Sequence, residues 1–151
     1  LEDLVIASPD VGGSKRASSY AKYLGVDLVL CHKQRAKANV VESMKIIGDV
    51  QGKNVIILDD MVDTAGTITK AADLMIENGA LSVRAFASHG VLSDPATERI
   101  EKSKLTAIYF TDSIPLKKES EKIKVLSVAD LIANTIINVN TNKSISSSYL
   151  V

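Results

Sequence analysis

The chain carries no net charge, because 18 basic residues balance 18 acidic ones. Nucleic acids and anionic membranes bind proteins with an excess of basic residues, so we expect neither as a partner, and a local site must recognise any anion. Cys31 is the only cysteine. No apolar run approaches the roughly 20 residues of a membrane span, and the N-terminus lacks the basic and then apolar pattern of a signal peptide. These absences favour a protein of the reducing cytoplasm.

The length and hydrophobic content predict one globular domain. With 151 residues, 46% of them hydrophobic, residues 1–151 can bury one substantial core. Strand-like and helix-like segments alternate along the chain, which is typical of an α/β fold with a parallel sheet flanked by helices. The predicted strands are Leu4–Ala7, Asp27–Leu30, Val55–Leu58, Val83–Ala87, Ala107–Phe110 and Ile123–Leu126.

Three segments have the apolar spacing of helices. One runs from Ser14 to Leu24 and is closed by Gly25. A second runs from Thr67 to Asn78, with an apolar stripe formed by Ile68, Ala71, Ala72, Met75 and Ile76. The third, Val128 to Ile137, is apolar around much of its circumference, so we expect it to be packed against the rest of the protein.

The stretch VIILDDMVDTAGT, which begins at Val55, predicts a phosphate and sugar site. Its four apolar residues read as a central strand covered on both faces, and Asp59, Asp60 and Asp63 follow. Free backbone N–H groups at a helix start, beside the Thr and Gly of Asp63, Thr64, Ala65, Gly66 and Thr67, form a cradle for an anion. Asp59 and Asp60 can accept hydrogen bonds from vicinal hydroxyls. The alternative is that Asp63 or Thr64 only caps the helix.

Two further segments carry charged or glycine-rich patterns. SPDVGGSKR, Ser8 to Arg16, is a loop that leads into a helix, where main-chain N–H groups can reach a diphosphate and Asp10 can hold Mg²⁺. Such a turn is weak evidence alone, but two anion cradles at the carboxyl ends of parallel strands reinforce each other. The polar segment from His32 to Glu42 predicts a solvated hairpin loop.

These motifs together resemble those of a known family. SPDVGGSKRA, HKQRAKANVVE, VIILDDMVDTAGTI, SHGVLSDPA and TDSIP occur in the order found in class I ribose-phosphate diphosphokinases, the enzymes that make phosphoribosyl diphosphate. The stretch at Val55 is shared with type I phosphoribosyltransferases, whereas the first two are more specific. Family members contain two phosphoribosyltransferase-like domains, and this chain resembles the C-terminal one. The resemblance implies that the N-terminal half of the parent is absent.

The resemblance also implies roles for individual residues. Asp59 and Asp60 would bind the ribose hydroxyls, and Asp63, Thr64, Ala65, Gly66 and Thr67 the 5-phosphate. Asp10, Val11, Gly12 and Gly13 would form the diphosphate loop, with Asp10 at Mg²⁺. Lys33 and Arg35 would lie on a mobile catalytic loop and stabilise charge during transfer, which revises the plain hairpin interpretation.

The implied reaction is attack of the 1-hydroxyl of ribose 5-phosphate on the β-phosphorus of ATP, with Mg²⁺ bridging the phosphates and AMP leaving. The chain has no motif for an activated Ser, Cys or Lys nucleophile, which agrees with catalysis by positioning and charge. Family members form dimers that assemble into hexamers, so the resemblance implies a homo-oligomer. Three alternatives stay open: a phosphoribosyltransferase, a non-catalytic regulatory subunit, and an isolated half that binds ribose 5-phosphate but catalyses nothing.

Overall fold

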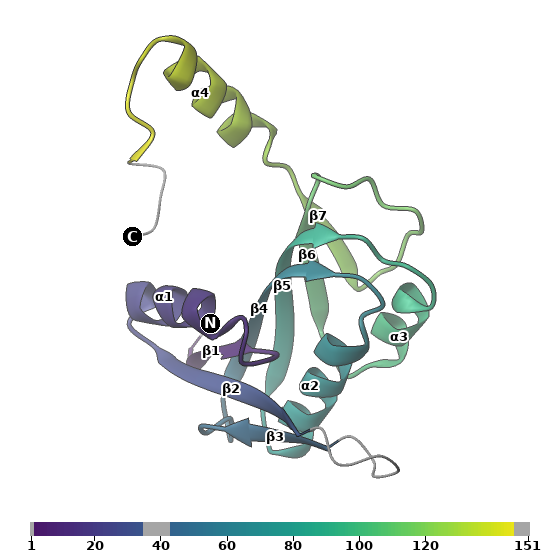
Figure 1. Ribbon diagram of the computed structural model, residues 1–151. Coiled ribbons are helices and arrows are strands. Elements are labelled where there is room, and N and C mark those ends of the chain that lie inside the picture. The colour runs from purple at the N-terminus through teal and green to yellow at the C-terminus, as the bar shows by residue number, and fades with distance from the viewer. Residues whose placement is uncertain (1, 35–42, 147–151) are drawn as a thin grey trace.

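The computed structural model describes residues 2–34 and 43–146. A seven-stranded sheet, in the order β3-β2-β1-β4-β5-β6-β7, forms the body of the protein (Figure 1). The strands are β1 (Leu4–Ser8), β2 (Asp27–Gln34), β3 (Ser43–Ile47), β4 (Asn54–Val62), β5 (Ser82–Gly90), β6 (Ala107–Thr111) and β7 (Ile123–Leu126). All six predicted strands are confirmed, and β4, which contains the predicted central strand, occupies the middle of the sheet.

The sheet is parallel except at one edge. β3 pairs antiparallel with β2, from Leu30 opposite Ile47 to Gln34 opposite Ser43. β2 and β3 are thus the two strands that flank the loop predicted between His32 and Glu42. Residues 35–42, which connect the two strands, lie outside the described residues.

Successive side chains of the central strands point to opposite faces of the sheet, and both faces are apolar. On β4, Val55 and Ile57 are fully buried in the larger core, whereas Ile56 and Leu58 pack against the smaller one. Removing one such side chain from water contributes about 1.5–3 kcal/mol. A near-continuous apolar run is therefore what a central parallel strand requires.

Helices cover the two faces unequally. α1 (Ser14–Leu24) lies on one face, and its buried residues, Ala17 and Ala21, lie one turn apart and pack with Ile6 of β1. Its predicted bounds are confirmed, because Gly25 adopts the left-handed conformation, at φ 66°, that ends a helix. α2 (Gly66–Glu77) and the short α3 (Ala96–Lys102) lie on the other face.

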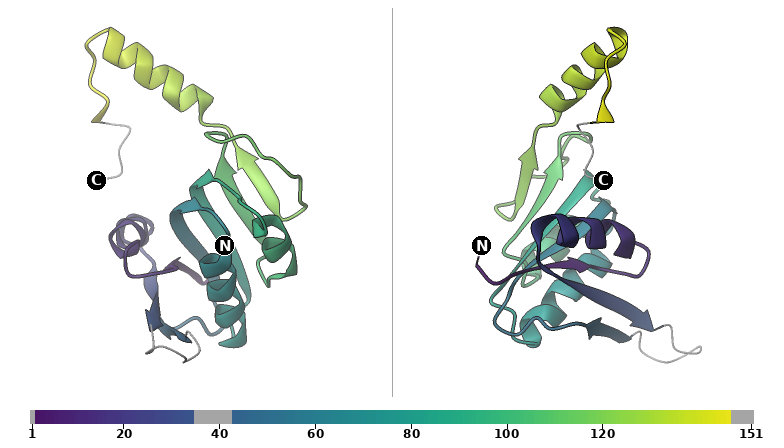
Figure 2. Two further views of the ribbon diagram at one scale, coloured as in Figure 1. Left: turned by 45° about the vertical axis from the view of Figure 1, so that its right-hand side comes forward. Right: turned by 90° about the vertical axis from the view of Figure 1, so that its left-hand side faces the viewer.

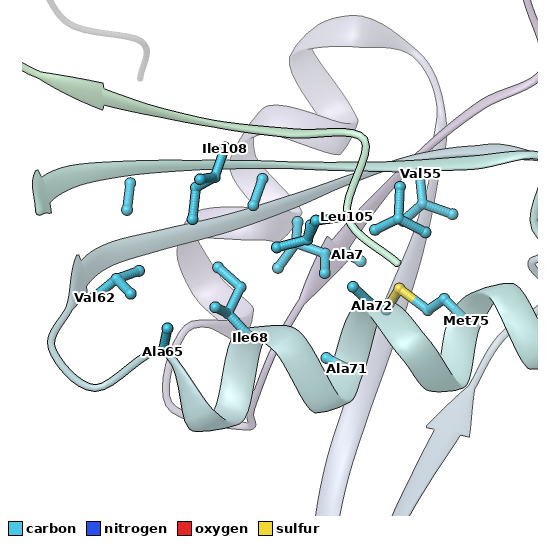
Figure 3. Close-up of a cluster of buried hydrophobic side chains, with 14 of the residues drawn as sticks. Ala7, Val55, Val62, Ala65, Ile68, Ala71, Ala72, Met75, Leu105 and Ile108 are labelled. Atoms are coloured by element: carbon cyan, nitrogen blue, oxygen red, sulfur yellow. The ribbon is translucent and has the colours of Figure 1, made fainter. Parts of the chain in front are cut away.

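The main core lies between α2 and the sheet (Figure 3). Ile68, Ala71, Ala72 and Met75 of α2 are buried there, as the apolar stripe predicts. They share this core with Ala7, Val55 and Ile108 from three strands, so α2 packs along the face of the sheet. The start of α2 is thereby held beside the end of the central strand.

The last helix corrects one prediction. α4 (Ala129–Asn140) forms close to the predicted range, yet none of its twelve residues, all of which the structure describes, is buried. It stands away from the sheet in both views of Figure 2. The prediction that this apolar helix is packed is wrong for the described part of the chain, where no other element covers it.

Candidate active site at the carboxyl ends of β1 and β4

The two aspartates that follow the buried run lie on β4 itself. The strand continues to Val62 instead of ending at Leu58, and Asp59 is in register with Ala87 of β5. The side chain of Asp59 is 23% exposed and that of Asp60 is 64% exposed. The Asp59 carboxylate is therefore largely shielded, whereas that of Asp60 faces solvent.

The segment from Asp63 to Thr67 joins β4 to α2 as a tight turn. Ala65 stands before the first turn of α2 with φ of 59°, a left-handed conformation that is uncommon for residues other than glycine. No side chain among the described residues caps α2. The capping alternative for Asp63 or Thr64 is therefore wrong, and the N–H groups of the first turn remain available to an anion.

The loop before α1 is ordered by its own polar groups. The Gly13 N–H donates to Asp10 Oδ1 over 2.9 Å, and the Ser8 hydroxyl donates to the Asp10 carbonyl over 2.7 Å. A Cβ on Gly13 would lie 2.7 Å from Ser8 Oγ and 3.9 Å from the Leu58 carbonyl oxygen. Glycine therefore lets the loop approach Ser8 of β1 this closely, whereas the distance to β4 is an ordinary contact.

A cleft of about 910 Å³ brings most of the predicted ligand-binding residues together. Its lining includes Asp10, Asp59, Asp60, Asp63, Thr64, Ala65, Gly66 and Thr67. Val11 is 55% exposed and, like Gly12 and Gly13, belongs to the loop beside Asp10. The residues predicted to bind sugar, phosphate and metal come from two separate motifs. They line the same cleft.

The two predicted catalytic residues are only partly described. The backbone of Lys33 belongs to β2 and pairs with Met44 of β3, a residue that lines the cleft. Nothing is described of the Lys33 side chain, and Arg35 lies outside the described residues.

Arg16 forms an unpredicted contact with both aspartates. Its Nη2 donates to Asp60 Oδ2 over 2.9 Å, and its Nη1 lies 3.9 Å from Asp59 Oδ1. Burial, followed by the hydrogen bond and charge of Asp60 and the charge of Asp10, raises the pKa of Asp59 to about 6. The hydrogen bond with Asp59 and the contact with Arg16 lower the pKa of Asp60.

Arg99 is the second cation that sequence reasoning missed. It reaches from α3, donates from Nη1 to the Thr64 carbonyl over 2.9 Å, and lines the cleft. A Cβ on Gly66 would lie 3.4 Å from the same Nη1 atom. Neither arginine has a sequence signal that indicates its partner, because 44 and 35 positions separate the bonded residues.

The carboxylates of the cleft suit a metal ion that takes its remaining ligands from a bound phosphate and from water. Within residues 2–34 and 43–146, no group of three or more His, Cys, Asp or Glu side chains is arranged to hold a metal ion. Mg²⁺ is commonly bound by one or two carboxylates together with waters and substrate phosphates, so Asp10 beside an anion cradle fits that mode. In contrast, the buried Cys31 is unsuited to catalysis, because burial raises its pKa to about 11.

Within the part of the chain that the structure describes, no helix is both long enough and apolar enough to cross a membrane.

Comparisons with known proteins relate the chain to one family and one fold. Residues 34–151 match the family described as phosphoribosyl synthetase-associated domain. A protein of Porphyromonas gingivalis named ribose-phosphate pyrophosphokinase is 62% identical over 149 residues, which are 99% of this chain and 48% of that protein. The crystal structure of phosphoribosylpyrophosphate synthetase from Mycobacterium smegmatis is 42% identical, with a TM-score of 0.85 over 93% of this chain and 46% of that chain.

A more distant structure agrees on the fold. Purine phosphoribosyltransferase from Pyrococcus horikoshii is 20% identical, with a TM-score of 0.50 over 83% of this chain and 70% of that chain. At that identity the likeness concerns the fold alone, and the predicted phosphoribosyltransferase-like α/β class is confirmed. The chain spans about half the length of the two closer proteins.

Proposed function

The chain belongs to the phosphoribosyl synthetase-associated domain family, and from this premise we propose that it is the C-terminal half of a ribose-phosphate pyrophosphokinase. The whole enzyme would transfer the diphosphoryl group of Mg-ATP to the 1-hydroxyl of ribose 5-phosphate, giving phosphoribosyl diphosphate and AMP for nucleotide biosynthesis. The motif order supports the C-terminal assignment. The parent reading frame should then encode about 150 further residues upstream, since one such domain is of that size.

One observation carries the proposal: a single cleft combines paired carboxylates with an uncapped helix start. In the proposed complex, Asp63 to Thr67 hold the 5-phosphate with main-chain N–H groups and threonine hydroxyls. Asp59 and Asp60 then accept hydrogen bonds from the ribose hydroxyls, which leaves the 1-hydroxyl directed toward the Asp10 loop. The paired carboxylates and the helix start in the same cleft match the hydroxyl and phosphate ends of a sugar phosphate.

The loop from Asp10 to Gly13 is proposed to hold the diphosphate portion of ATP. Asp10 would hold Mg²⁺ directly or through water, and bound Mg²⁺ would neutralise phosphate charge. Lys33 and Arg35 are proposed to stabilise the charge that develops on the transferred group, because this reaction needs positioning and electrostatics but no covalent intermediate.

The isolated half is proposed to bind ribose 5-phosphate without turning it over. It spans 48% of its Porphyromonas gingivalis relative, and the remaining length is available to supply nucleotide contacts. We propose a cytoplasmic homo-oligomer for the parent, with dimers that assemble into a hexamer. A phosphoribosyltransferase activity is less favoured: the Val55 stretch is common to both families, but SPDVGGSKRA and HKQRAKANVVE resemble the diphosphokinases, and the phosphoribosyltransferase above shares only the fold. The regulatory-subunit alternative is also less favoured, because Lys33, Arg35, Asp59, Asp60 and Asp63 are all present.

Calorimetric titration of the chain with ribose 5-phosphate tests the proposed site. Asn at positions 59 and 60 keeps the shape of the side chains but removes the charged acceptors, so Asp59→Asn with Asp60→Asn should weaken binding at least roughly tenfold. The control pair is Asp27→Asn with Asp130→Asn, which removes the same charge from two exposed positions outside the cleft. Equal affinities for the wild type and the 59/60 variant would refute the assignment.

A further inference from the structure

Arg16 connects the Asp10–Gly13 loop to the carboxylates of β4. It lies in the first turn of α1, directly after the Asp10–Gly13 loop, and its guanidinium reaches Asp59 and Asp60 of β4. The 2.9 Å bond to Asp60 is a charge-assisted hydrogen bond, whereas the 3.9 Å approach to Asp59 is an ion pair without a hydrogen bond. One side chain therefore links the diphosphate loop to the carboxylates of the ribose site.

Only one of the two terminal nitrogens of Arg16, Nη2, donates a hydrogen bond to a described residue. Its Nη1 atom is buried and has no hydrogen-bond partner among the described residues. A buried donor without a partner raises the free energy of the ligand-free state, and a neighbouring ligand oxygen would remove that cost. The side chain as a whole is 38% exposed, so solvent and ligand can reach the rest of it.

The two carboxylates require a cation between them. Asp59 and Asp60 are adjacent, and Asp59 Oδ1 already accepts the Asp60 N–H over 2.9 Å. Without a positive group, the second charge would repel the first, and one carboxyl would rotate away or take a proton. Either change would remove a hydrogen-bond acceptor that a sugar hydroxyl needs.

We propose that Arg16 is a positioning residue for ribose recognition: its guanidinium holds the Asp59 and Asp60 carboxylates as a fixed pair of acceptors for vicinal hydroxyls. This inference rests on the proposed ribose site. Arginine suits the role better than lysine, because its planar fork addresses two carboxylates at once, whereas an ammonium acts as a single point charge. The neighbouring Lys15 is exposed and carries the same charge, so it is the matched control position.

The experiment compares two ligands across four proteins. Wild type, Arg16→Gln, Arg16→Lys and Lys15→Gln are titrated with ribose 5-phosphate and with 2-deoxyribose 5-phosphate, which carries the same phosphate but lacks one hydroxyl. Loss of a charge-assisted contact predicts that Arg16→Gln binds ribose 5-phosphate about tenfold more weakly, with a smaller loss for the deoxy sugar. Arg16→Lys should show an intermediate loss, and Lys15→Gln should bind both ligands like the wild type.

The outcomes separate this inference from the function on which it rests. If wild type binds neither sugar phosphate, the proposed function fails. If wild type binds and Arg16→Gln binds equally well, Arg16 has no positioning role. An equal loss for both sugars, or the same loss in Lys15→Gln, would show that Arg16 acts by general charge, and the inference would be overturned. If Arg16→Gln does not fold, Arg16→Lys provides the test. If that variant has the wild-type ratio of affinities for ribose 5-phosphate and 2-deoxyribose 5-phosphate, the proposal is contradicted.

Discussion

At the scale of single residues, the site depends on keeping negative charge where water is scarce. Asp59 is largely shielded and lies beside Asp60, with Asp10 adding further negative charge. Such a carboxylate is costly in the ligand-free protein and useful in the complex, since shielded acceptors bind hydroxyls more strongly than solvated ones. Burial accordingly raises the pKa of Asp59 above its ordinary value.

The raised pKa of Asp59 predicts that the free energy of unfolding depends on pH. Its pKa rises from 3.8 to about 6 on folding, so between these values only the folded state holds the proton. The stabilising contribution of this group is present below pH 3.8 and is lost as the pH rises through about 6. Relative to Asp59→Asn, the wild type should lose unfolding free energy as the pH increases from about 4 to about 7.

Urea denaturation at several pH values measures this difference. Asp27→Asn, at an exposed position, should give a curve parallel to that of the wild type. The lowered pKa of Asp60 acts in the opposite direction and below the ordinary range of a carboxyl, so it does not mask the effect. Parallel curves for the wild type and Asp59→Asn would contradict the raised pKa.

We predict that replacing Lys33 lowers kcat in the full-length enzyme. It is proposed to stabilise charge only during transfer, so Lys33→Ala should lower kcat by on the order of 10²-fold while changing the KM for ribose 5-phosphate much less. Lys45→Ala, an exposed lysine on the partner strand of the same hairpin, is the control. A raised KM with an unchanged kcat would instead identify Lys33 as a substrate-binding residue.

At the scale of elements, the strongest local signals predicted the structure best. Gly25 ends α1 where its left-handed preference requires, and the apolar stripe of α2 faces the core. α3 gave no usable signal, because its seven residues are too few to establish a period. Local patterns also could not find Arg16 or Arg99 in the site, since their partners are brought near only by the completed sheet.

The start of α1 predicts a specific steric coupling. An Ala at position 13 would place its Cβ 2.7 Å from Ser8 Oγ, whereas at position 12 the nearest atom is 3.3 Å away. Gly13→Ala should therefore lower the unfolding free energy by about 1–3 kcal/mol, and Gly12→Ala by less. Adding Ser8→Ala to Gly13→Ala removes the obstructing oxygen and should recover part of the loss.

Thermal unfolding of the wild type, Gly13→Ala, Ser8→Ala and the double variant forms a complete cycle, and Gly12→Ala is the comparison outside it. A favourable coupling between positions 8 and 13 is the expected result. If the two changes simply add, the close approach of the Asp10–Gly13 loop to β1 does not depend on glycine at position 13.

At the scale of the whole molecule, the sequence predicted the parallel sheet but not what surrounds α4. An apolar helix is normally covered, and that expectation led to the prediction of a packed element. In the structure, Leu131, Ile132, Ile136, Ile137 and Val139 of α4 are each more than half exposed. No pattern within one segment reveals whether the surface that covers it belongs to the same stretch of chain.

We predict that the half of the parent not spanned here covers α4. The chain spans 48% of its Porphyromonas gingivalis relative, and an exposed apolar helix face is more costly in water than one packed against a second domain. Ile136→Glu should then change the unfolding free energy of this chain by less than about 0.5 kcal/mol, the range of surface substitutions. In the full-length protein the same change buries a charge and should cost at least about 2 kcal/mol. Asn134→Glu, on the opposite side of α4, controls for helix propensity and charge in both proteins, and an equal effect of Ile136→Glu in the two would show that α4 stays uncovered.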